Sequence, residues 1–528
     1  MTSVAGAIGE RLRTAGVHQV FGHPGGEVVD LIEGFRQAGL EFILARHETD
    51  AAFMAEAMAS STGRPGVCLA TLGPGATNLV TGVAHAYLDR APVIVVTGQL
   101  PVDRYEMVTH QKLDLRALFA PITKWQARVS AANVAAVTDR ALRIAVRPRQ
   151  GPVFLEIPSD VAAQNATSVA AEPLPAVPSA VPDPGRIRAA AALLSESARP
   201  VLLAGLDALD AAVSGPLRRL AEAWGLPVIL SPKAKGLLRD DHPLSIGTIE
   251  GLGSAKLYEW IAGRDLVLMA GFDPVEFDRD WPSSAPIIHI SPLPNDDRQF
   301  RSAVEIVGNV PAALEALCAG ARPKDTADAT RFRDEFRRFV RPSRDGLTSQ
   351  EVLGALREAL PEDALVSCDV GFNKSVSIQC WPAYAPRTFF VSNGLSSMGY
   401  GLPAAIGLKL AHPEKAVACI LGDGGFAMSV AELETAARLG LTITVVILAD
   451  EALQQIKGAQ ERKGFAVTGT TFNALDYGAL ATAYGADGIE VRTLDECRAA
   501  FRDAARADRV TLIAAHVDPS GYRLDASR

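Results

Sequence analysis

Short apolar runs rich in β-branched residues alternate along the chain with longer stretches of helical character. Each run is apolar almost throughout, which is typical of strands buried on both faces of a sheet. Ala- and Leu-rich helical segments such as 191–198 and 429–440 lie between the runs. The pattern predicts the α/β class, with parallel sheets covered by helices on both sides. The runs stand at residues 92–98, 152–158, 200–205, 265–271, 286–291, 416–424, 442–450 and 510–517.

Two stretches interrupt this alternation and divide the chain. Residues 164–184 are rich in Ala, Pro and Ser and indicate a linker, whereas residues 321–345 are charged and indicate a second connection with a helical segment. The 528 residues also exceed the roughly 250–300 residues that a single core sustains. We therefore predict three doubly wound parallel-sheet domains, at residues 1–163, 185–320 and 346–528.

Composition narrows the possible functions. The net charge is −8 and the chain has no basic run, which argues against binding of nucleic acid or of an anionic membrane surface. No apolar run approaches the roughly 18 residues of a membrane span, and the N-terminal segment carries charges where a signal peptide needs an apolar core. The six cysteines form no CxxC pair, which is typical of reduced thiols in an intracellular protein. We expect a cytoplasmic protein.

One buried run ends in a turn that places an acid between glycines, in the sequence "CILGDGGFAM" at 419–428. Ligands of an open parallel sheet bind beyond the carboxyl ends of its strands, so we expect Asp423 at that edge. A helix is expected to begin near Ser429, and its N-terminus favours an anion that the glycines let the backbone approach. The Asp423 carboxylate would repel this anion unless a divalent cation lay between them.

A second acid follows at the end of the next run. Asp450 comes 27 residues after Asp423, about the length of one strand–helix–strand unit, so both side chains are expected at the same sheet edge. Alone, Asp423 would more often be a turn residue and Asp450 a helix N-cap. Together they favour a magnesium site, because Mg²⁺ typically takes one or two carboxylates together with phosphate oxygens and water.

The sequence "GDGGF" followed by "LAD" resembles the metal–diphosphate motif of thiamine-diphosphate enzymes. The chain as a whole is similar to acetolactate synthases, through six blocks at 20–28, 46–59, 73–99, 109–125, 392–407 and 422–440. It is most similar to the FAD-independent, catabolic members, in the "HQ" at 110–111, in "GFDPVEF" at 271–277 and in the acid at position 450. The resemblance implies a pyrimidine-binding, a central and a diphosphate-binding domain. It also implies thiamine diphosphate and Mg²⁺ as cofactors, without FAD.

The resemblance assigns cofactor roles to individual residues. Glu48, in "RHETD", would hydrogen-bond the pyrimidine N1′ and so favour the tautomer whose 4′-imino group removes the C2 proton. Met398 would lie between the two cofactor rings, and the carbonyl of Ser396 would accept from the 4′-amino group. The third protein ligand of the metal would be the carbonyl of Ala452. The remaining cofactor contacts would come from Gly25, Asn373, Gly422, Gly424 and Gly425.

The resemblance also implies a reaction and an assembly. The reaction is decarboxylation of a 2-oxo acid, pyruvate, and carboligation of the two-carbon unit to a second carbonyl, giving 2-acetolactate. His110 and Gln111 are its implied substrate-side residues. The active sites would lie at the interface of a homo-oligomer, either a dimer or a dimer of dimers. The sequence leaves open the donor, the acceptor, the choice between dimer and tetramer, and a regulatory subunit.

The chain departs from its relatives near the implied substrate site. Lys112 replaces a small residue, and it either binds an anionic acceptor or is simply solvated. Gln454 and Gln455 belong to an altered segment that follows the metal position and would shape the acceptor pocket. The alternative function is therefore that of a related lyase or transferase. The candidates are a 2-oxo acid decarboxylase, a 2-hydroxyacyl lyase, or an enzyme that transfers an acetyl group to an anionic aldehyde. A non-catalytic scaffold is disfavoured, because it need not keep the cofactor residues.

Overall fold

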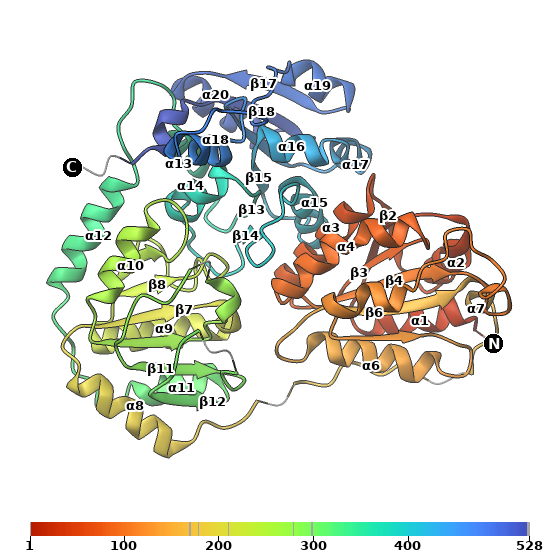
Figure 1. The fold of residues 1–528 in the computed structure, drawn as a ribbon, viewed down its shortest axis with the longest axis horizontal. Helices are drawn as coiled ribbons and strands as arrows, with labels where there is room; N and C mark the ends of the chain where they lie inside the picture. Colours follow the sequence, from red (N-terminus) through yellow and green to blue (C-terminus); the bar gives the residue numbers. More distant parts are fainter. Residues whose placement is uncertain are drawn as a thin grey trace. The chain divides into compact units, whose positions relative to one another are not determined.

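The structure is a computed structural model that describes residues 2–167, 170–177, 179–209, 211–277, 279–296 and 299–524. It contains three six-stranded parallel sheets with helices between the strands (Figure 1). The predicted α/β class with three doubly wound sheets is confirmed. The chain forms two compact units: one holds residues 1–177 with 394–414 and 429–441, and the other holds the rest.

The first sheet has the strand order β2-β1-β3-β4-β6-β5. Side chains of α1, α2 and α6 pack with Val67 and Leu69 of β3 in one apolar cluster, whereas α3 packs on β1 and β3. The strands are β1 (Gln19–His23), β2 (Glu41–Leu44), β3 (Gly66–Ala70), β4 (Val93–Gln99), β5 (Trp125–Arg128) and β6 (Val153–Pro158). The α-helices are α1 (Val4–Thr14), α2 (Val29–Gln37), α3 (Glu48–Thr62), α4 (Pro74–Leu88), α5 (Leu115–Phe119), α6 (Val134–Val146) and α7 (Ser159–Ala162). Short 3₁₀ turns are η1 (Gly26–Val28), η2 (Val102–Arg104) and η3 (Ala120–Ile122).

The second sheet has the strand order β12-β11-β10-β7-β8-β9. Its strands are β7 (Pro200–Ala204), β8 (Val228–Leu230), β9 (Ser245–Thr248), β10 (Leu266–Ala270), β11 (Ile287–Ser291) and β12 (Val304–Val307). Its helices are α8 (Pro184–Glu196), α9 (Ala211–Trp224), α10 (Ser254–Ala262) and α11 (Val310–Leu317), with η4 (Leu206–Ala208) and η5 (Pro274–Glu276). Helix α12 (Ala327–Phe339) then leads to the third sheet, which confirms a helical segment in the second predicted connection.

The third sheet has the strand order β14-β13-β15-β16-β18-β17. Its strands are β13 (Leu365–Cys368), β14 (Phe389–Val391), β15 (Val417–Gly422), β16 (Thr444–Ala449), β17 (Asp487–Val491) and β18 (Thr511–His516). The helices that follow α12 are α13 (Ser349–Ala359), α14 (Phe372–Cys380), α15 (Gly401–Ala411), α16 (Asp423–Ser429), α17 (Glu432–Arg438), α18 (Gln454–Arg462), α19 (Tyr477–Ala483) and α20 (Leu494–Ala504), with η6 (Pro519–Tyr522). Helices α15 and α17 belong to the unit of the first sheet.

Every apolar run predicted as a strand is a strand. Residues 168, 169 and 178 of the predicted linker lie outside the described residues. The helix expected near Ser429 was wrong in its start, because α16 already begins at Asp423 and ends at Ser429. Gly424 and Gly425 therefore form the first helical turn rather than a separate loop. The physical consequence is that Asp423 itself stands at the helix N-terminus, where a negative charge is favoured.

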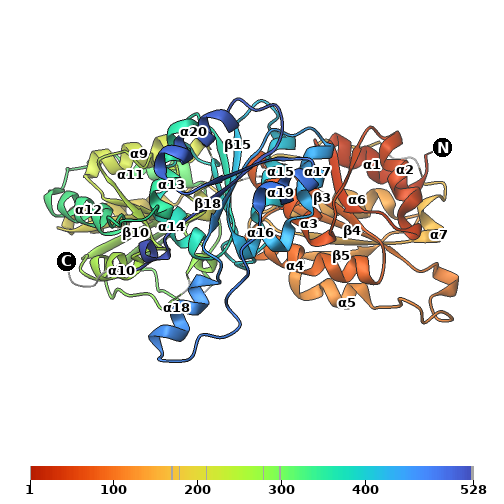
Figure 2. The same ribbon diagram turned by 90° about the horizontal axis from the view of Figure 1, so that it is seen from above.

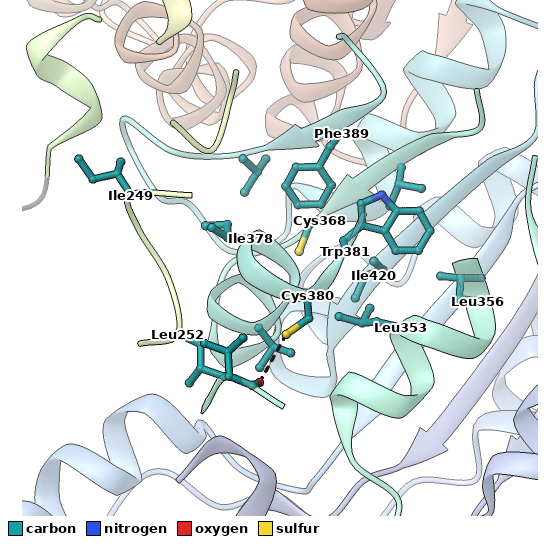
Figure 3. Packing of buried hydrophobic residues seen from close by; sticks show 14 of the residues in the cluster. Ile249, Leu252, Leu353, Leu356, Cys368, Ile378, Cys380, Trp381, Phe389 and Ile420 are labelled. Carbon is teal, nitrogen blue, oxygen red and sulfur yellow. Dashed lines mark hydrogen bonds between the residues drawn. The ribbon is translucent and has the colours of Figure 1, made fainter. Parts of the chain in front are cut away.

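One apolar core joins the second and third sheets within their unit. It includes Leu252 beside β9, Trp381 and Cys380 at the end of α14, and Ile420 of β15 (Figure 3). All six cysteines are free thiols in the structure, and all except Cys318 are buried. No helix among the described residues has the length and apolarity needed to cross a membrane.

The segment "GFDPVEF" closes the carboxyl end of β10 against the turn after β7. Glu276 is fully buried, and its carboxylate accepts hydrogen bonds from the N–H groups of Leu206 (2.8 Å) and Asp273 (3.4 Å). Burial raises the pKa of Glu276 from its ordinary 4.5 to about 8. Hydrogen bonds from Ser231 and Leu206 lower this pKa, and the charge of Asp273 raises it. The folded protein therefore holds a proton on Glu276 that the unfolded chain releases.

Replacement of this carboxyl should change how stability depends on pH. Because the folded-state pKa is raised, the contribution of Glu276 is fully present below pH 4.5 and is lost as pH rises through about 8. In Glu276→Gln the opening free energy of the second sheet, measured by native-state hydrogen exchange, should fall less between about pH 6 and about pH 9 than in the wild type. Equal pH dependence in the two proteins would show that Glu276 is already ionised when folded.

Candidate active site

The carboxyl end of β15 presents Asp423 to a ring of backbone donors. The Asp423 carboxylate accepts hydrogen bonds from the N–H groups of Gly424 (2.8 Å), Asp450 (3.2 Å) and Glu451 (2.6 Å). The last two donors follow β16, which pairs with β15 in parallel, so the two strand ends meet as the sequence predicted. Burial nevertheless raises the pKa of Asp423, and these hydrogen bonds only partly offset it.

Asp450 lies beside Asp423, and the two carboxylates repel each other. Burial and the Asp423 charge raise the pKa of Asp450 to about 7, against hydrogen bonding from Tyr522, Ala452 N–H and Gln454. Two carboxylates in a partly buried site are unfavourable without a positive charge between them. A divalent cation fits this donor set, because it would remove the repulsion and leave room for phosphate oxygens.

The turn after Asp450 has an unusual backbone. Glu451 adopts the left-handed conformation with φ of 58°, which costs a non-glycine residue of order 1 kcal/mol or more. The carbonyl of Ala452 accepts a hydrogen bond from Gln454 N–H at 2.9 Å, and a second lone pair of this oxygen remains for a metal. The Gln454 side chain donates to the Asp450 carbonyl at 3.3 Å, so the structure places Gln454 beside this turn.

Glycines beside Asp423 form a cradle that a side chain would fill. A Cβ built on Gly425 would lie 2.2 Å from Oδ2 of Asp369, a fully buried acid at the end of β13. A Cβ on Gly422 would lie 3.4 Å from Oδ1 of Asn373, whose amide donates to the Asp369 carbonyl at 2.7 Å. The structure thus brings Asn373 together with the glycines predicted to contact the diphosphate.

Glu48 stands at the first position of α3 in the other unit. The preceding residue, His47, is the N-cap of this helix, and its Nδ1 accepts from Thr49 N–H. The Glu48 side chain is buried and accepts a hydrogen bond from Asn78 Nδ2 at 3.0 Å. A Cβ on Gly75, in the first turn of α4, would lie 3.4 Å from Oε1 of Glu48. The carboxylate is therefore held between the starts of two helices.

The other residues predicted to contact the pyrimidine, Gly25, Ser396 and Met398, belong to the same unit as Glu48. Gly25 precedes η1, and a Cβ on it would meet Thr71 at 2.6 Å, which explains the need for glycine. Ser396 adopts the left-handed conformation with φ of 54°, and Met398 follows it just before α15. Helix α15 packs closely on α3, because a Cβ on its Gly407 would lie 2.4 Å from the Met54 carbonyl.

The three residues predicted to contact the substrate, His110, Gln111 and Lys112, differ in exposure and in the partners they contact. Gln111 has a φ of 56°, and its side chain lies against Gly73, two residues before the glycine that faces Glu48. His110 is exposed to solvent. Lys112 forms an ion pair with Glu106 at 3.1 Å, and its Nζ lies 4.5 Å from the ring centre of Tyr105. Lys112 therefore has partners within its own loop.

Backbone strain gathers in the segments predicted for the site. Among the described residues, the non-glycine positions with positive φ are Arg90, Gln111, Arg387, Ser396 and Glu451. Gln111, Ser396 and Glu451 belong to the candidate substrate, pyrimidine and metal segments. Residues held in such conformations cluster at functional sites, because the surrounding structure must enforce them.

Sequence reasoning missed three residues that support the site. Asn78 holds Glu48, Asp369 lies against Gly425, and Tyr522 lies beside Asp450. The Tyr522 ring stacks on Phe372 with centroids 4.7 Å apart, next to Asn373. Only Asp369 carried a signal, since it follows a short apolar run ending at Cys368. Helix α18, which follows the turn at Glu451, has no buried residue and projects from its domain (Figure 2).

Comparison with known proteins identifies the class of protein. Three thiamine pyrophosphate (TPP) enzyme models match the chain: the N-terminal TPP binding domain at residues 2–118, the central domain at 187–317 and the C-terminal TPP binding domain at 369–515. The fold and these three matches therefore define a thiamine-diphosphate-dependent enzyme.

Full-length relatives narrow the class. An acetolactate synthase of Arthrospira platensis is 34% identical, covering 92% of this chain and 89% of its own. One from Bacillus subtilis is 32% identical, covering 96% and 91%. A catabolic acetolactate synthase of Raoultella terrigena is 30% identical, covering 97% and 95%. The chain belongs to the acetolactate synthase family of thiamine pyrophosphate enzymes.

The glycine cradle can be tested by adding one methyl group. Gly425→Ala would place a Cβ against the Asp369 carboxylate, so the helix start must shift and thiamine diphosphate affinity should fall by tenfold or more. Gly354→Ala in α13 is the control, because its Cβ meets no atom within 4 Å. Calorimetric titration of both variants in Mg²⁺ decides the matter. Equal affinity in the two would remove Gly425 from the cofactor site.

Proposed function

We propose that this protein decarboxylates pyruvate and joins the two-carbon unit to a second pyruvate, giving 2-acetolactate, with thiamine diphosphate and Mg²⁺. The proposal is carried by the pairing of Asp423 and Asp450 at adjacent strand ends, in a chain whose relatives are acetolactate synthases. Incubation of the pure protein with pyruvate and both cofactors should yield 2-acetolactate. Acetaldehyde as the only product would favour the alternative, a simple 2-oxo acid decarboxylase.

Residues of this chain would hold the cofactor at both ends. Asp423, Asp450 and the Ala452 carbonyl would bind Mg²⁺, while N–H groups of Gly424 and Gly425 and the Asn373 amide would face the diphosphate. Glu48 would hydrogen-bond the pyrimidine and hold its tautomer, and Met398 would support the folded ring arrangement. Thiamine diphosphate, when bound, supplies a nucleophilic carbon and a positively charged thiazolium ring that accepts the electron pair released by decarboxylation. Gly25 and Ser396 would contact the pyrimidine through their backbones.

We propose that the enzyme works without FAD. In doubly wound domains a dinucleotide diphosphate binds the backbone N–H groups of the first strand–helix turn. In the second sheet this turn follows β7, and its Leu206 N–H donates to the buried Glu276 carboxylate. A Cβ on Gly205 of the same turn would lie 2.4 Å from Glu276, so the side chain fills the space above it. The pure protein should therefore be colourless and active without added flavin.

The contacts of Lys112 favour the carboligase over acetyl transfer to an anionic aldehyde. Its ammonium pairs with Glu106 and lies over Tyr105, so its charge is partly satisfied within the loop. His110 and Gln111 would then contact the carbonyl and carboxylate groups of the substrate. The two half-sites would complete each other in a homodimer or a dimer of dimers, with the pyrimidine half of one subunit facing the diphosphate half of its partner.

Loss of one metal ligand should uncouple the cofactor from Mg²⁺. In Asp423→Ala the affinity for thiamine diphosphate in Mg²⁺ should fall by more than about tenfold, since even residues behind metal ligands account for roughly 10–100-fold. Asp495→Ala, which removes a carboxylate that is 96% exposed in the same domain, should bind as the wild type does. An unchanged affinity of Asp423→Ala would contradict the metal assignment.

Glu48→Gln separates cofactor binding from cofactor activation. The amide is nearly isosteric with the carboxylate but removes its charge, so thiamine diphosphate should bind with similar affinity while C2 proton exchange slows by about a hundredfold or more. Hydrogen–deuterium exchange of the bound cofactor measures this rate directly. Glu41→Gln at an exposed position of β2 serves as the control. A wild-type exchange rate in Glu48→Gln would exclude Glu48 from activation.

A further inference from the structure

A cavity of about 300 Å³ opens between the second and third sheets, within one compact unit and away from the cofactor residues. Its walls are the edge strand β9, helix α12 with the residues after it, and the end of α14 with the segment that follows. None of the residues assigned to thiamine diphosphate, metal or substrate lines it. A volume of this size lies at the lower end of small-molecule sites.

The cavity contains a guanidinium without an anionic partner. Arg337 is half-buried, and its Nη2 donates to the backbone carbonyls of Asp240 (2.6 Å) and Ser245 (3.2 Å). Among the described residues, no carboxylate forms an ion pair with Arg337. Burial and the charge of Arg333 lower the pKa of Arg337, the charge of Asp240 opposes this, and the charge of Arg341 lowers the pKa further. The site therefore has unbalanced positive charge.

The other charges at the cavity are already paired, apart from one. Lys235 binds the Asp240 carboxylate at 2.8 Å. Asp241 pairs with Arg239 outside the cavity. Arg341, which lies two residues after the end of α12 and also lines the cavity, donates to the Cys380 carbonyl at 3.2 Å and has no carboxylate partner among the described residues. Two guanidiniums thus remain for an incoming anion.

An aromatic wall stands opposite this charge. Phe336, Trp381 and Tyr384 line the same cavity, and Trp381 packs in the apolar core (Figure 3). The Trp381 side chain is 1% exposed, and its Nε1–H has no hydrogen-bond acceptor among the described residues. Buried donors are normally satisfied, so an acceptor atom in the cavity would complete this group.

We propose that this cavity is a second binding site, for an organic oxyanion that carries a flat apolar group. The carboxylate or phosphate would accept one hydrogen bond from Nη1 of Arg337, because both Nη2–H groups already donate to backbone carbonyls, and a further contact from Arg341. The apolar group would lie among the apolar side chains that line the cavity, such as Ile246, Phe336 and Val340. Because the cavity joins the central domain to the domain of the metal site, its occupation would stabilise their packing.

Phenyl phosphate, benzoate and inorganic phosphate test this site. The protein is first saturated with thiamine diphosphate and Mg²⁺, so that the cofactor site cannot take up the probes, and each probe is titrated by calorimetry. At least one aromatic probe should bind more tightly than inorganic phosphate. Stronger binding of phenyl phosphate indicates a phosphate ligand, and stronger binding of benzoate indicates a carboxylate ligand.

Variants of α12 show whether the bound probe is in the cavity. Arg337→Met should weaken binding of the aromatic probe by about ten- to a hundredfold, because a charge-assisted contact is lost. Arg338→Met removes the adjacent exposed cation and should bind as the wild type does. If Arg337→Met does not fold, Arg337→Lys keeps the charge without the planar guanidinium and should still weaken binding. The proposal is overturned if no aromatic probe binds, or if these Arg337 variants match the wild type.

Discussion

The repulsion between two carboxylates, Asp423 and Asp450, is the constraint on which the candidate site depends. Parallel pairing of β15 and β16 brings both side chains to one sheet edge, and burial there raises the pKa of each. The backbone donors around Asp423 reduce this penalty but do not remove it. A bound cation would remove it, and the same cation would attract a diphosphate to the start of α16.

Neighbouring residues hold the two acids in place at this sheet edge. Glycine at 425 lets the helix start approach Asp369, and the strained turn at Glu451 aims two N–H groups at Asp423. Tyr522, from the last described turn of the chain, supports Asp450 and stacks on Phe372. In the other unit, α15 packs on α3, which begins at Glu48, and the Ser396–Met398 segment lies in the irregular stretch just before α15. The candidate residues therefore stand at strand ends, at helix starts and in the segments that join them.

The sequence predicted those features that depend on local pattern. Continuous apolar runs identified eight of the strands but missed others that are equally buried, such as β3 and β13. The position of Asp423 and Asp450 predicted that their two strand ends meet, which the parallel pairing of β15 and β16 confirms. Edge strands such as β5 and β17 escaped prediction, because their partly exposed residues include Arg128 and Glu490. The sequence did not predict the contact of Glu276, which caps a turn 70 residues earlier in the chain. It also did not predict the ion pair of Lys112 with Glu106, because the loop that contains both has no periodic pattern. The start of α16 was misplaced because consecutive glycines usually indicate a turn, whereas here an acid at the N-terminus stabilises a helix.

The dependence of cofactor binding on the cation tests this account most directly. Protein stripped of metal by a chelator is titrated with thiamine diphosphate in a calorimeter, once with the chelator alone and once with excess Mg²⁺. The carboxylate pair should repel the diphosphate without metal, so tight binding is predicted only in Mg²⁺. Equal affinity under the two conditions would contradict the account, because the diphosphate would then bind this edge without the cation that the two acids require.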